Sequence, residues 1–181
     1  QTSALPICNN PVPTTGGNQW WWYTDTYRAL LQADPADTRA ALTCRTADYG
    51  TGGRRIGWTE KLMGRVDNGT RIFDSDFILY RYGEAFLMAA EARYYGKDYA
   101  GALEALAPLA ARAYGRRDYY TDTSPEAVLQ AIVDEYLREM VGEGRTWWML
   151  LRTDKIWEYS ADIAAQRDKN PNILLWPITQ A

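Results

Sequence analysis

The stretch EYLREMVGEGRTWWMLLR, residues 135–152, decides the fold of this chain. Its glutamates Glu135, Glu139 and Glu143 recur at four-residue spacing, so a helix places them on one face. Like charges stacked in this way repel each other, and cations from elsewhere in the chain must offset them. Paired carboxylates are also the acid and base of glycoside hydrolysis, so the pattern alone permits a structural or a catalytic role.

An ion network explains these glutamates better than a catalytic pair does. They lie on one predicted helix with apolar residues between them, whereas the carboxylates of a glycosidase flank a substrate cleft. Buried charges in proteins are generally paired. We therefore expect a buried or half-buried network that joins a helix over residues 77–95 to the helices on either side of Gly144. Its expected cations are Arg81, Arg138, Arg145 and Arg152.

The composition limits the possible classes of protein. The chain has 181 residues and a formal net charge of −3, which gives no basic surface for nucleic acid. No apolar run approaches the roughly 18 residues that a membrane-spanning helix needs. The chain contains no histidine, which removes the commonest general base and the commonest metal ligand. The acidic residues show no EF-hand spacing, so we expect no cofactor or metal, and calcium binding by the plentiful aspartates stays an open alternative.

Aromatic residues with a polar edge are unusually frequent, with 8 tryptophans and 13 tyrosines but only 3 phenylalanines. Such rings suit surfaces that bind sugars or proteins, although most rings pack in cores. Adjacent residues on a helix or strand cannot all face one core, so a run of them favours contact with a ligand. This run, the first candidate for ligand binding, is Trp20, Trp21, Trp22 and Tyr23.

A second candidate for ligand binding is the pair Tyr49 and Trp58, which lie with two arginines on a Gly-rich stretch. Exposed aromatic patches are as often protein interfaces as ligand sites, so a protein contact remains the alternative for both candidates. Trp147 and Trp148 are expected to be structural instead, because they lie inside the stretch that carries the glutamates.

Residues 1–75 are expected to be rich in loops and to contain the candidate ligand region. A short helix or turn is expected over residues 34–42, and a surface loop over residues 44–58. Asn68-Gly69 is the strongest short hairpin signal, so two strands are expected over residues 62–73. The cysteines at positions 8 and 44 fit neither a CxxC pair nor a zinc site, and both a disulfide and two free thiols remain open.

Residues 76–181 are expected to be helical. The first two helices are ended by Gly96 and Gly115 and form a hairpin near the length of a tetratricopeptide unit. Pro108 inside the second helix should kink or split it. Ser124 and Pro125 are a favourable start for the third helix. The four expected helices cover about residues 77–95, 99–114, 125–142 and 145–159.

Several stretches resemble motifs of the SusD/RagB family. RYGEAFLMAAEA (81–92) is similar to its Arg-Tyr-x-Glu and Ala-Glu-Ala helix, and DEYLREMVGEGRTWWMLLR (134–152) to its Glu-Arg…Glu-Leu…Glu-Gly…Trp-x-Asp-Leu…Arg signature. LLWPIT (174–179) resembles the Leu-x-Pro-Ile-Pro element near the family's C-terminus. DPADTR (34–39) and Lys61 resemble two weaker markers. One motif would be unspecific, but all of them agree here in order and spacing.

Three positions depart from the family pattern. Tyr136 stands where the family usually has Arg, Met149 where it usually has Asp, and Thr179 replaces the second proline. Each change removes a polar or a rigid element. We therefore expect the ion network to be connected differently here.

The resemblance implies a mostly α fold: a SusD-like α-helical superhelix with a tetratricopeptide-like helical hairpin, loop-rich segments and a small β-hairpin. Family members are usually much longer and begin with a lipidated cysteine and helical repeats. The resemblance thus identifies the chain as the C-terminal portion of such a protein, with the N-terminal helical half and the lipid anchor not present in it.

The resemblance also implies a function without catalysis. Family members are lipoproteins exposed on the outer membrane that capture glycans, sometimes peptides, and pass them to a SusC-like TonB-dependent transporter. The candidate aromatic residues named above would then bind an oligo- or polysaccharide. The alternative is a helical-repeat scaffold that binds only peptides or protein partners. A glycosidase is the third and weakest hypothesis.

Overall fold

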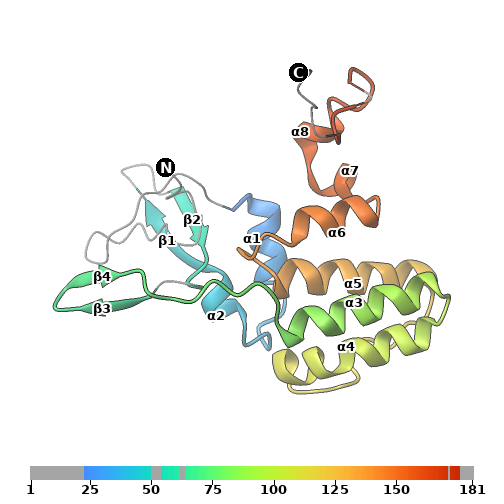
Figure 1. The fold of residues 1–181 in the computed structure, drawn as a ribbon, viewed down its shortest axis with the longest axis horizontal. Helices are drawn as coiled ribbons and strands as arrows, with labels where there is room; N and C mark the ends of the chain where they lie inside the picture. Colours follow the sequence, from blue (N-terminus) through green and yellow to red (C-terminus); the bar gives the residue numbers. More distant parts are fainter. Residues whose placement is uncertain (1–22, 50–53, 62–63, 171, 176–181) are drawn as a thin grey trace.

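The computed structural model describes residues 23–49, 54–61, 64–170 and 172–175. These ranges form eight helices and two separate two-stranded antiparallel sheets (Figure 1). The chain is therefore mostly helical with small β-hairpins, and the predicted fold class is confirmed. None of the described helices is long and apolar enough to cross a membrane.

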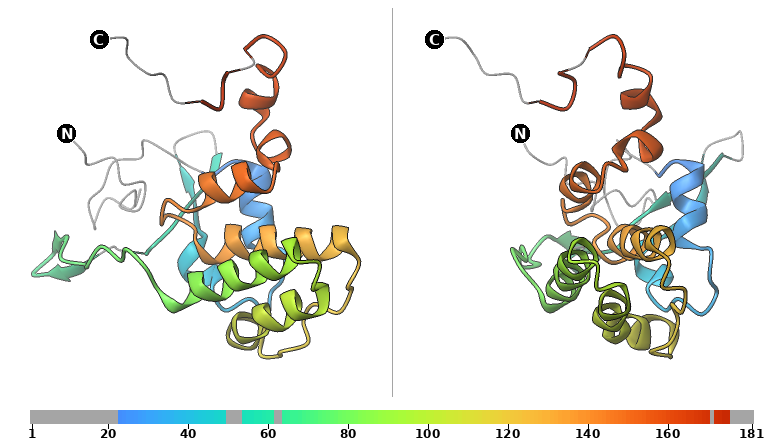
Figure 2. Two further views of the ribbon diagram at one scale, coloured as in Figure 1. Left: turned by 45° about the vertical axis from the view of Figure 1, so that its right-hand side comes forward. Right: turned by 90° about the vertical axis from the view of Figure 1, so that its right-hand side faces the viewer.

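Three helices form the centre of the molecule: α3 (Tyr82–Tyr95), α4 (Tyr99–Tyr114) and α5 (Pro125–Glu139). Each packs against the other two, and Figure 2 shows them side by side in both views. Their shared core includes Leu87, Leu106 and Ile132, all fully buried. A short turn joins α3 to α4, so the predicted tetratricopeptide-like hairpin is present.

The ends of α4 follow from local chemistry. The Asp98 side chain accepts a hydrogen bond from the Gly101 amide and caps the first turn. Gly115 ends the helix with φ of 74°, the left-handed conformation that glycine adopts at little cost. The helix is not split at Pro108, because Leu106 and Leu109 on either side are buried in the core and hold both halves together.

The start of α3 corrects the sequence prediction. A helix was expected from residue 77, but residues 73–80 form neither helix nor strand, and Phe77 and Leu79 are 62% and 64% exposed. Arg81 is the N-cap residue, with an extended backbone (φ −146°). This conformation is stabilised by the long-range contacts of the Arg81 guanidinium with α5, which local helix propensity does not report.

The helices after α5 are shorter than expected. α5 ends at Glu139 rather than near residue 142, and Gly142 and Gly144 follow with positive φ. The single helix predicted over residues 145–159 is broken at Asp154, which has φ of 56°. The resulting helices are α6 (Thr146–Arg152), α7 (Ile156–Tyr159) and α8 (Ala161–Ala164), which extend away from the bundle in Figure 1.

The described residues before α3 form two short helices and two hairpins. The helices are α1 (Asp25–Leu31) and α2 (Ala40–Thr43). The hairpin predicted around Asn68-Gly69 is confirmed: β3 (Arg65–Asp67) pairs with β4 (Thr70–Ile72) and projects from the molecule.

The loop predicted over residues 44–58 is wrong. β1 (Arg45–Tyr49) pairs there with β2 (Arg54–Trp58) in antiparallel register, with Tyr49 opposite Arg54. Both strands contain residues that favour pleated structure, such as Thr46 and Ile56, and the glycines between the strands masked that pattern.

Candidate functional site

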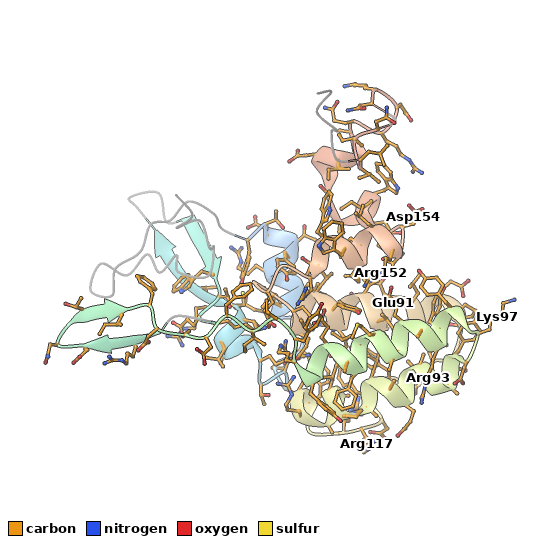
Figure 3. The ribbon with its side chains drawn as sticks, viewed as in Figure 1. Glu91, Arg93, Lys97, Arg117, Arg152 and Asp154 are labelled. Atoms are coloured by element: carbon orange, nitrogen blue, oxygen red, sulfur yellow. The ribbon has the colours of Figure 1, made fainter. Side chains whose placement is uncertain are left out.

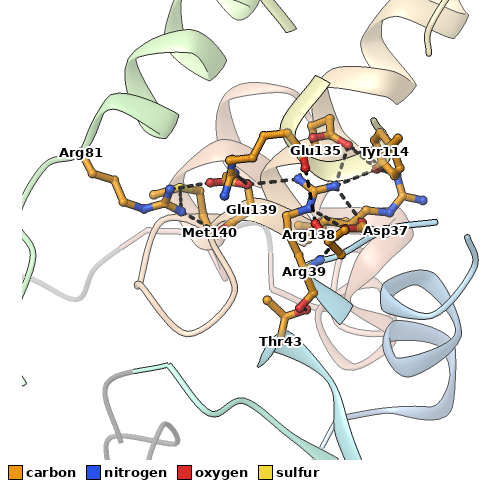
Figure 4. Close-up of polar contacts among 12 residues, drawn as sticks. Asp37, Arg39, Thr43, Arg81, Tyr114, Glu135, Arg138, Glu139 and Met140 are labelled. Atoms are coloured by element: carbon orange, nitrogen blue, oxygen red, sulfur yellow. Dashed lines mark hydrogen bonds and ion pairs between the residues drawn. The ribbon is translucent and has the colours of Figure 1, made fainter. Parts of the chain in front are cut away.

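The three glutamates project from the C-terminal half of α5 and the turn after it. Glu135 and Glu139 are 0% and 2% exposed, and Glu143 is partly buried. Figure 4 shows the polar contacts around the first two. Buried carboxylates of like charge are stable only where cations and hydrogen-bond donors surround them, and such groups arrive here from several distant parts of the chain.

Arg39 is the central cation of this ion network. It precedes α2, and its guanidinium donates to Asp37 (2.8 Å), Glu135 (2.8 Å) and Glu139 (3.1 Å). It also donates to the Tyr114 hydroxyl at 2.7 Å. The planar guanidinium can bind several carboxylates at once, which a lysine cannot do with the same geometry. Arg39 therefore ties α2 to both α4 and α5.

Arg81 and Lys61 provide the cations around Glu143 and share Glu139 with Arg39. Arg81 donates to both Glu139 and Glu143, with 2.7 Å to the Glu143 carboxylate. The Lys61 ammonium donates to the Glu143 carboxylate at 2.7 Å and to the Glu139 carbonyl at 2.6 Å. Arg112, from α4, adds another ion pair to Glu139. We refer to Arg39, Lys61, Arg81, Arg112 and the three glutamates as the ion network.

Two further ion pairs join α3 to the next helices. Arg152 of α6 donates to both carboxylate oxygens of Glu91, at 2.7 and 2.9 Å, and Figure 3 labels both residues. Arg145 pairs with Glu84 at 3.2 Å. Of the four predicted cations, Arg81 pairs with the three-glutamate series, and Arg138 lies 3.8 Å from the Glu135 carboxylate. Arg145 and Arg152 pair with carboxylates of α3 instead, and Arg39, Lys61 and Arg112 were missed as cations. Two of these positions lie in the weaker family markers, a signal that sequence analysis did not connect to the glutamates.

The surrounding cations keep the carboxylates of Glu139 and Glu143 ionised. Burial raises the pKa of Glu139, but the hydrogen bond and charge of Arg81, with the charge of Arg112, outweigh burial and lower it to about 2. Burial also raises the pKa of Glu143, and hydrogen bonds from Arg81 and Lys61 bring it below its ordinary value. A carboxyl group that stays ionised cannot donate a proton, so this geometry does not suit Glu139 to general acid chemistry.

The two described departures from the family pattern lie in the interior. Tyr136 is 1% exposed, and its hydroxyl finds no hydrogen-bond partner within the described ranges. Met149 is fully buried, and its sulfur lies 3.7 Å from the Thr153 hydroxyl. Neither Tyr136 nor Met149 carries a charge that could form an ion pair. The ion pairs that an arginine and an aspartate at these positions would form are therefore not part of this structure. Thr179 lies outside the described residues.

A cavity of about 310 Å³ opens beside the ion network. It lies between α2, the irregular segment before α3 and the end of α5. Its wall combines large apolar side chains with charged groups of the network. The lining residues are Arg39, Leu42, Thr43, Lys61, Phe77, Ile78, Arg81, Arg112, Glu139 and Glu143.

The structure describes the side chains of only two of the six candidate aromatic residues, Tyr23 and Trp58. Trp20, Trp21 and Trp22 lie outside the described residues, as does the Tyr49 side chain. The half-buried Tyr23 donates from its hydroxyl to the Thr43 carbonyl (2.9 Å) and from its amide to the Gly57 carbonyl (3.3 Å).

Trp58 follows Gly57 in β2, so the structure brings Tyr23 and Trp58 close together through the backbone. Trp58 is 5% exposed in this chain, and its indole N–H has no partner within the described part. All six candidates stay predictions.

The described cysteine and acidic residues provide no further candidate site. Cys44 is buried and forms no disulfide within the described residues, and burial raises the pKa of its thiol to about 11. Cys8 lies outside the described residues. Among the residues that the structure describes, no cluster of Cys, Asp and Glu could hold a metal ion.

Comparison with known proteins identifies the family. The model of the SusD family matches residues 48–180. The chain belongs to the SusD family. SusD-family proteins are known as binding proteins rather than enzymes. The comparison with curated proteins found no match.

Two solved structures of SusD superfamily proteins resemble this SusD-family chain. One, from Bacteroides fragilis NCTC 9343, is 29% identical with a TM-score of 0.61, over 81% of this chain and 31% of that protein. The other, from Bacteroides vulgatus ATCC 8482, is 29% identical with a TM-score of 0.60, over 72% of this chain and 28% of that protein. The chain thus spans about a third of the length of these relatives.

Proposed function

We propose that this chain is part of a lipoprotein on the outer-membrane surface that binds glycans and delivers them to a SusC-like TonB-dependent transporter. The observation that carries the proposal is the family match over residues 48–180. The ion network supports it, because the family motifs at Arg81, Glu139 and Glu143 meet in space as one structural unit. The glutamates then stabilise the fold and leave ligand binding to other residues.

We place the glycan site at the aromatic residues Trp20–Trp22, Tyr23, Tyr49 and Trp58. Rings of this kind present an apolar face and a polar edge, which suits a pyranose. The hydrogen bond between the Tyr23 amide and the Gly57 carbonyl supports a single site, because it joins the end of the tryptophan run to the strand that carries Trp58.

Glycan binding is tested with the complete gene product, by affinity gels that contain different polysaccharides. We expect at least one of Trp20→Ala, Trp21→Ala and Trp22→Ala to weaken binding about tenfold, about 1.4 kcal/mol, as for an aromatic residue at the centre of a binding surface. Trp148→Ala is the matched control, because Trp148 is an exposed tryptophan on α6, outside the proposed site. Saccharide affinity that none of the three changes alters would refute the site.

A second measurement separates the proposal from a scaffold that binds only peptides or proteins. The complete protein is purified from outer membranes with mild detergent, and its co-purifying proteins are identified by mass spectrometry. A TonB-dependent transporter in the complex, together with saccharide binding, is the expected result. Binding of peptides but of no saccharide would replace the glycan proposal with the scaffold.

A further inference from the structure

The segment before α3 exposes an unusual amount of apolar surface. Residues 73–80 form no helix or strand, and four neighbouring side chains, Phe77, Ile78, Leu79 and Tyr80, are between 47% and 76% exposed. Tyr82, at the start of α3, is also exposed. Contiguous apolar patches on a protein surface usually mark an interaction site. We call these five residues the apolar segment.

The apolar segment is fixed in position although it is exposed. Arg145 donates to the Leu79 carbonyl and pairs with Glu84, and its guanidinium lies 5.1 Å from the centre of the Tyr80 ring. Arg81, between Tyr80 and Tyr82, is anchored to the ion network. A surface held in this way binds a partner without first losing the entropy of ordering.

The apolar segment is continuous with the cavity beside the ion network. Phe77 and Ile78 line the cavity of about 310 Å³, and so does the exposed Leu42. Arg112 lies at the rim with 55% of its side chain exposed. Only one of its guanidinium nitrogens donates to a group within the described ranges, namely the Glu139 carboxylate. The rim therefore offers N–H donors to an incoming carboxylate.

The two solved relatives are much longer than the part of them that this chain matches. The chain matches only 31% and 28% of the lengths of the two solved relatives, so most of their polypeptide lies outside the matched part. We propose that the apolar segment and the adjoining cavity bind a segment of the SusD fold that lies outside residues 1–181, within the same protein. That segment places a large apolar side chain in the cavity and an Asp or Glu carboxylate against Arg112.

Photo-crosslinking in the complete gene product tests this proposal. Phe77→benzoylphenylalanine is expected to form crosslinks, on irradiation, to a peptide outside residues 1–181 that carries a large apolar residue near Asp or Glu. Arg117→benzoylphenylalanine is the matched control, because the exposed Arg117 lies on the connection between α4 and α5, and no such crosslink is expected there. Mass spectrometry identifies the crosslinked peptides.

Several results would overturn the proposal. These are crosslinks from position 77 that stay within residues 1–181, crosslinks to a second copy or to another protein, and a gene product without further polypeptide. A crosslinked peptide that lacks Asp and Glu would refute the contact with Arg112. If the Phe77 variant does not fold, Tyr82→benzoylphenylalanine takes its place, because Tyr82 is exposed on the same surface.

Discussion

The helical bundle and the apolar segment before α3 distribute their side chains in opposite ways. The bundle buries the carboxylates of Glu135 and Glu139 and surrounds them with cations. The apolar segment exposes Phe77 and Leu79, although both are large and apolar. Charged side chains are thus buried in the bundle, and apolar side chains are exposed in the apolar segment. Proteins usually expose charged residues and bury large apolar ones, so both regions reverse the usual distribution.

The difference indicates which interactions are complete within this chain. Each buried glutamate of the network already has its cations and donors, so this region is satisfied by residues of the chain itself. The side chains of the apolar segment are largely exposed among the described residues, and the segment proposed above to bind there would complete their burial. The family motifs therefore mark the stabilised region, while the surfaces available for binding lie beside it. The following predictions test this division.

The largest effect is expected for Glu139→Gln, which leaves Arg39, Arg81 and Arg112 without a shared carboxylate. Removing one member of a buried ion network costs about 3–5 kcal/mol of unfolding free energy. Urea unfolding of the full chain measures it. Glu104→Gln is the control, because the Glu104–Arg117 pair is exposed and its loss should stay below about 1 kcal/mol. Equal losses for both variants would contradict the division between the regions.

Acid is expected to weaken the bundle through the same residue. The folded-state pKa of Glu139 is about 2, below its ordinary 4.5, so its contribution is fully present above pH 4.5 and is lost as pH falls toward 2. The difference corresponds to about 3 kcal/mol. Unfolding free energies between pH 6 and pH 2 should therefore fall less steeply for Glu139→Gln than for the parent chain. Identical slopes would refute this role of Glu139.

A moderate effect is expected for Arg39→Lys. The charge is kept, but one ammonium group cannot donate to Asp37, Glu135 and Tyr114 in the geometry of the guanidinium. Hydrogen bonds to charged groups contribute about 1.5–3 kcal/mol each, so we expect a loss of about 2 kcal/mol after partial compensation. Arg117→Lys, at an exposed pair, serves as the reference and should change stability little. If Arg39→Lys lowers the unfolding free energy no more than Arg117→Lys does, a positive charge alone at position 39 is enough for stability, and the geometry of the guanidinium is not needed.

The smallest effect is expected in the hairpin β3–β4, which projects from the molecule. Gly69 has φ of 78°, and no described atom lies within 4 Å of the place that a Cβ would take, so Gly69→Ala adds only backbone strain of about 1 kcal/mol. Amide hydrogen exchange should report easier opening of the hairpin, with global unfolding unchanged. Gly64→Ala should disrupt the hairpin more, because its added methyl would meet the Ile72 carbonyl. Equal exchange in both variants would contradict this.

Local sequence signals predicted a large part of the fold. The bounds of α4 and the start of α5 followed from Gly115 and from Ser124-Pro125, and Asn68-Gly69 gave the hairpin. These features depend on neighbours in the sequence. The predicted start of α3 was wrong because Arg81 contacts Glu139, 58 positions away in the sequence. That contact favours an extended backbone at Arg81.

The sequence predicted the candidate site less well than it predicted the fold. The spacing of the glutamates predicted that cations must surround them, but not that Arg39 supplies them, since it lies 96 positions from Glu135. The sequence favoured an aromatic ligand contact at Trp58, which stays a prediction, but it did not indicate that only 5% of Trp58 is exposed in this chain. Burial depends on the packing of distant elements, which a pattern of residue types does not report.

A double-mutant cycle between Arg81 and Glu139 tests the central claim most directly, namely that the ion network holds α3 against α5. The free energies of unfolding are measured in urea for the full chain, Arg81→Met, Glu139→Gln and the double variant. We predict a coupling of about 2 kcal/mol, because the two groups contact each other in a largely buried site. Effects that add to within about 0.5 kcal/mol would contradict it.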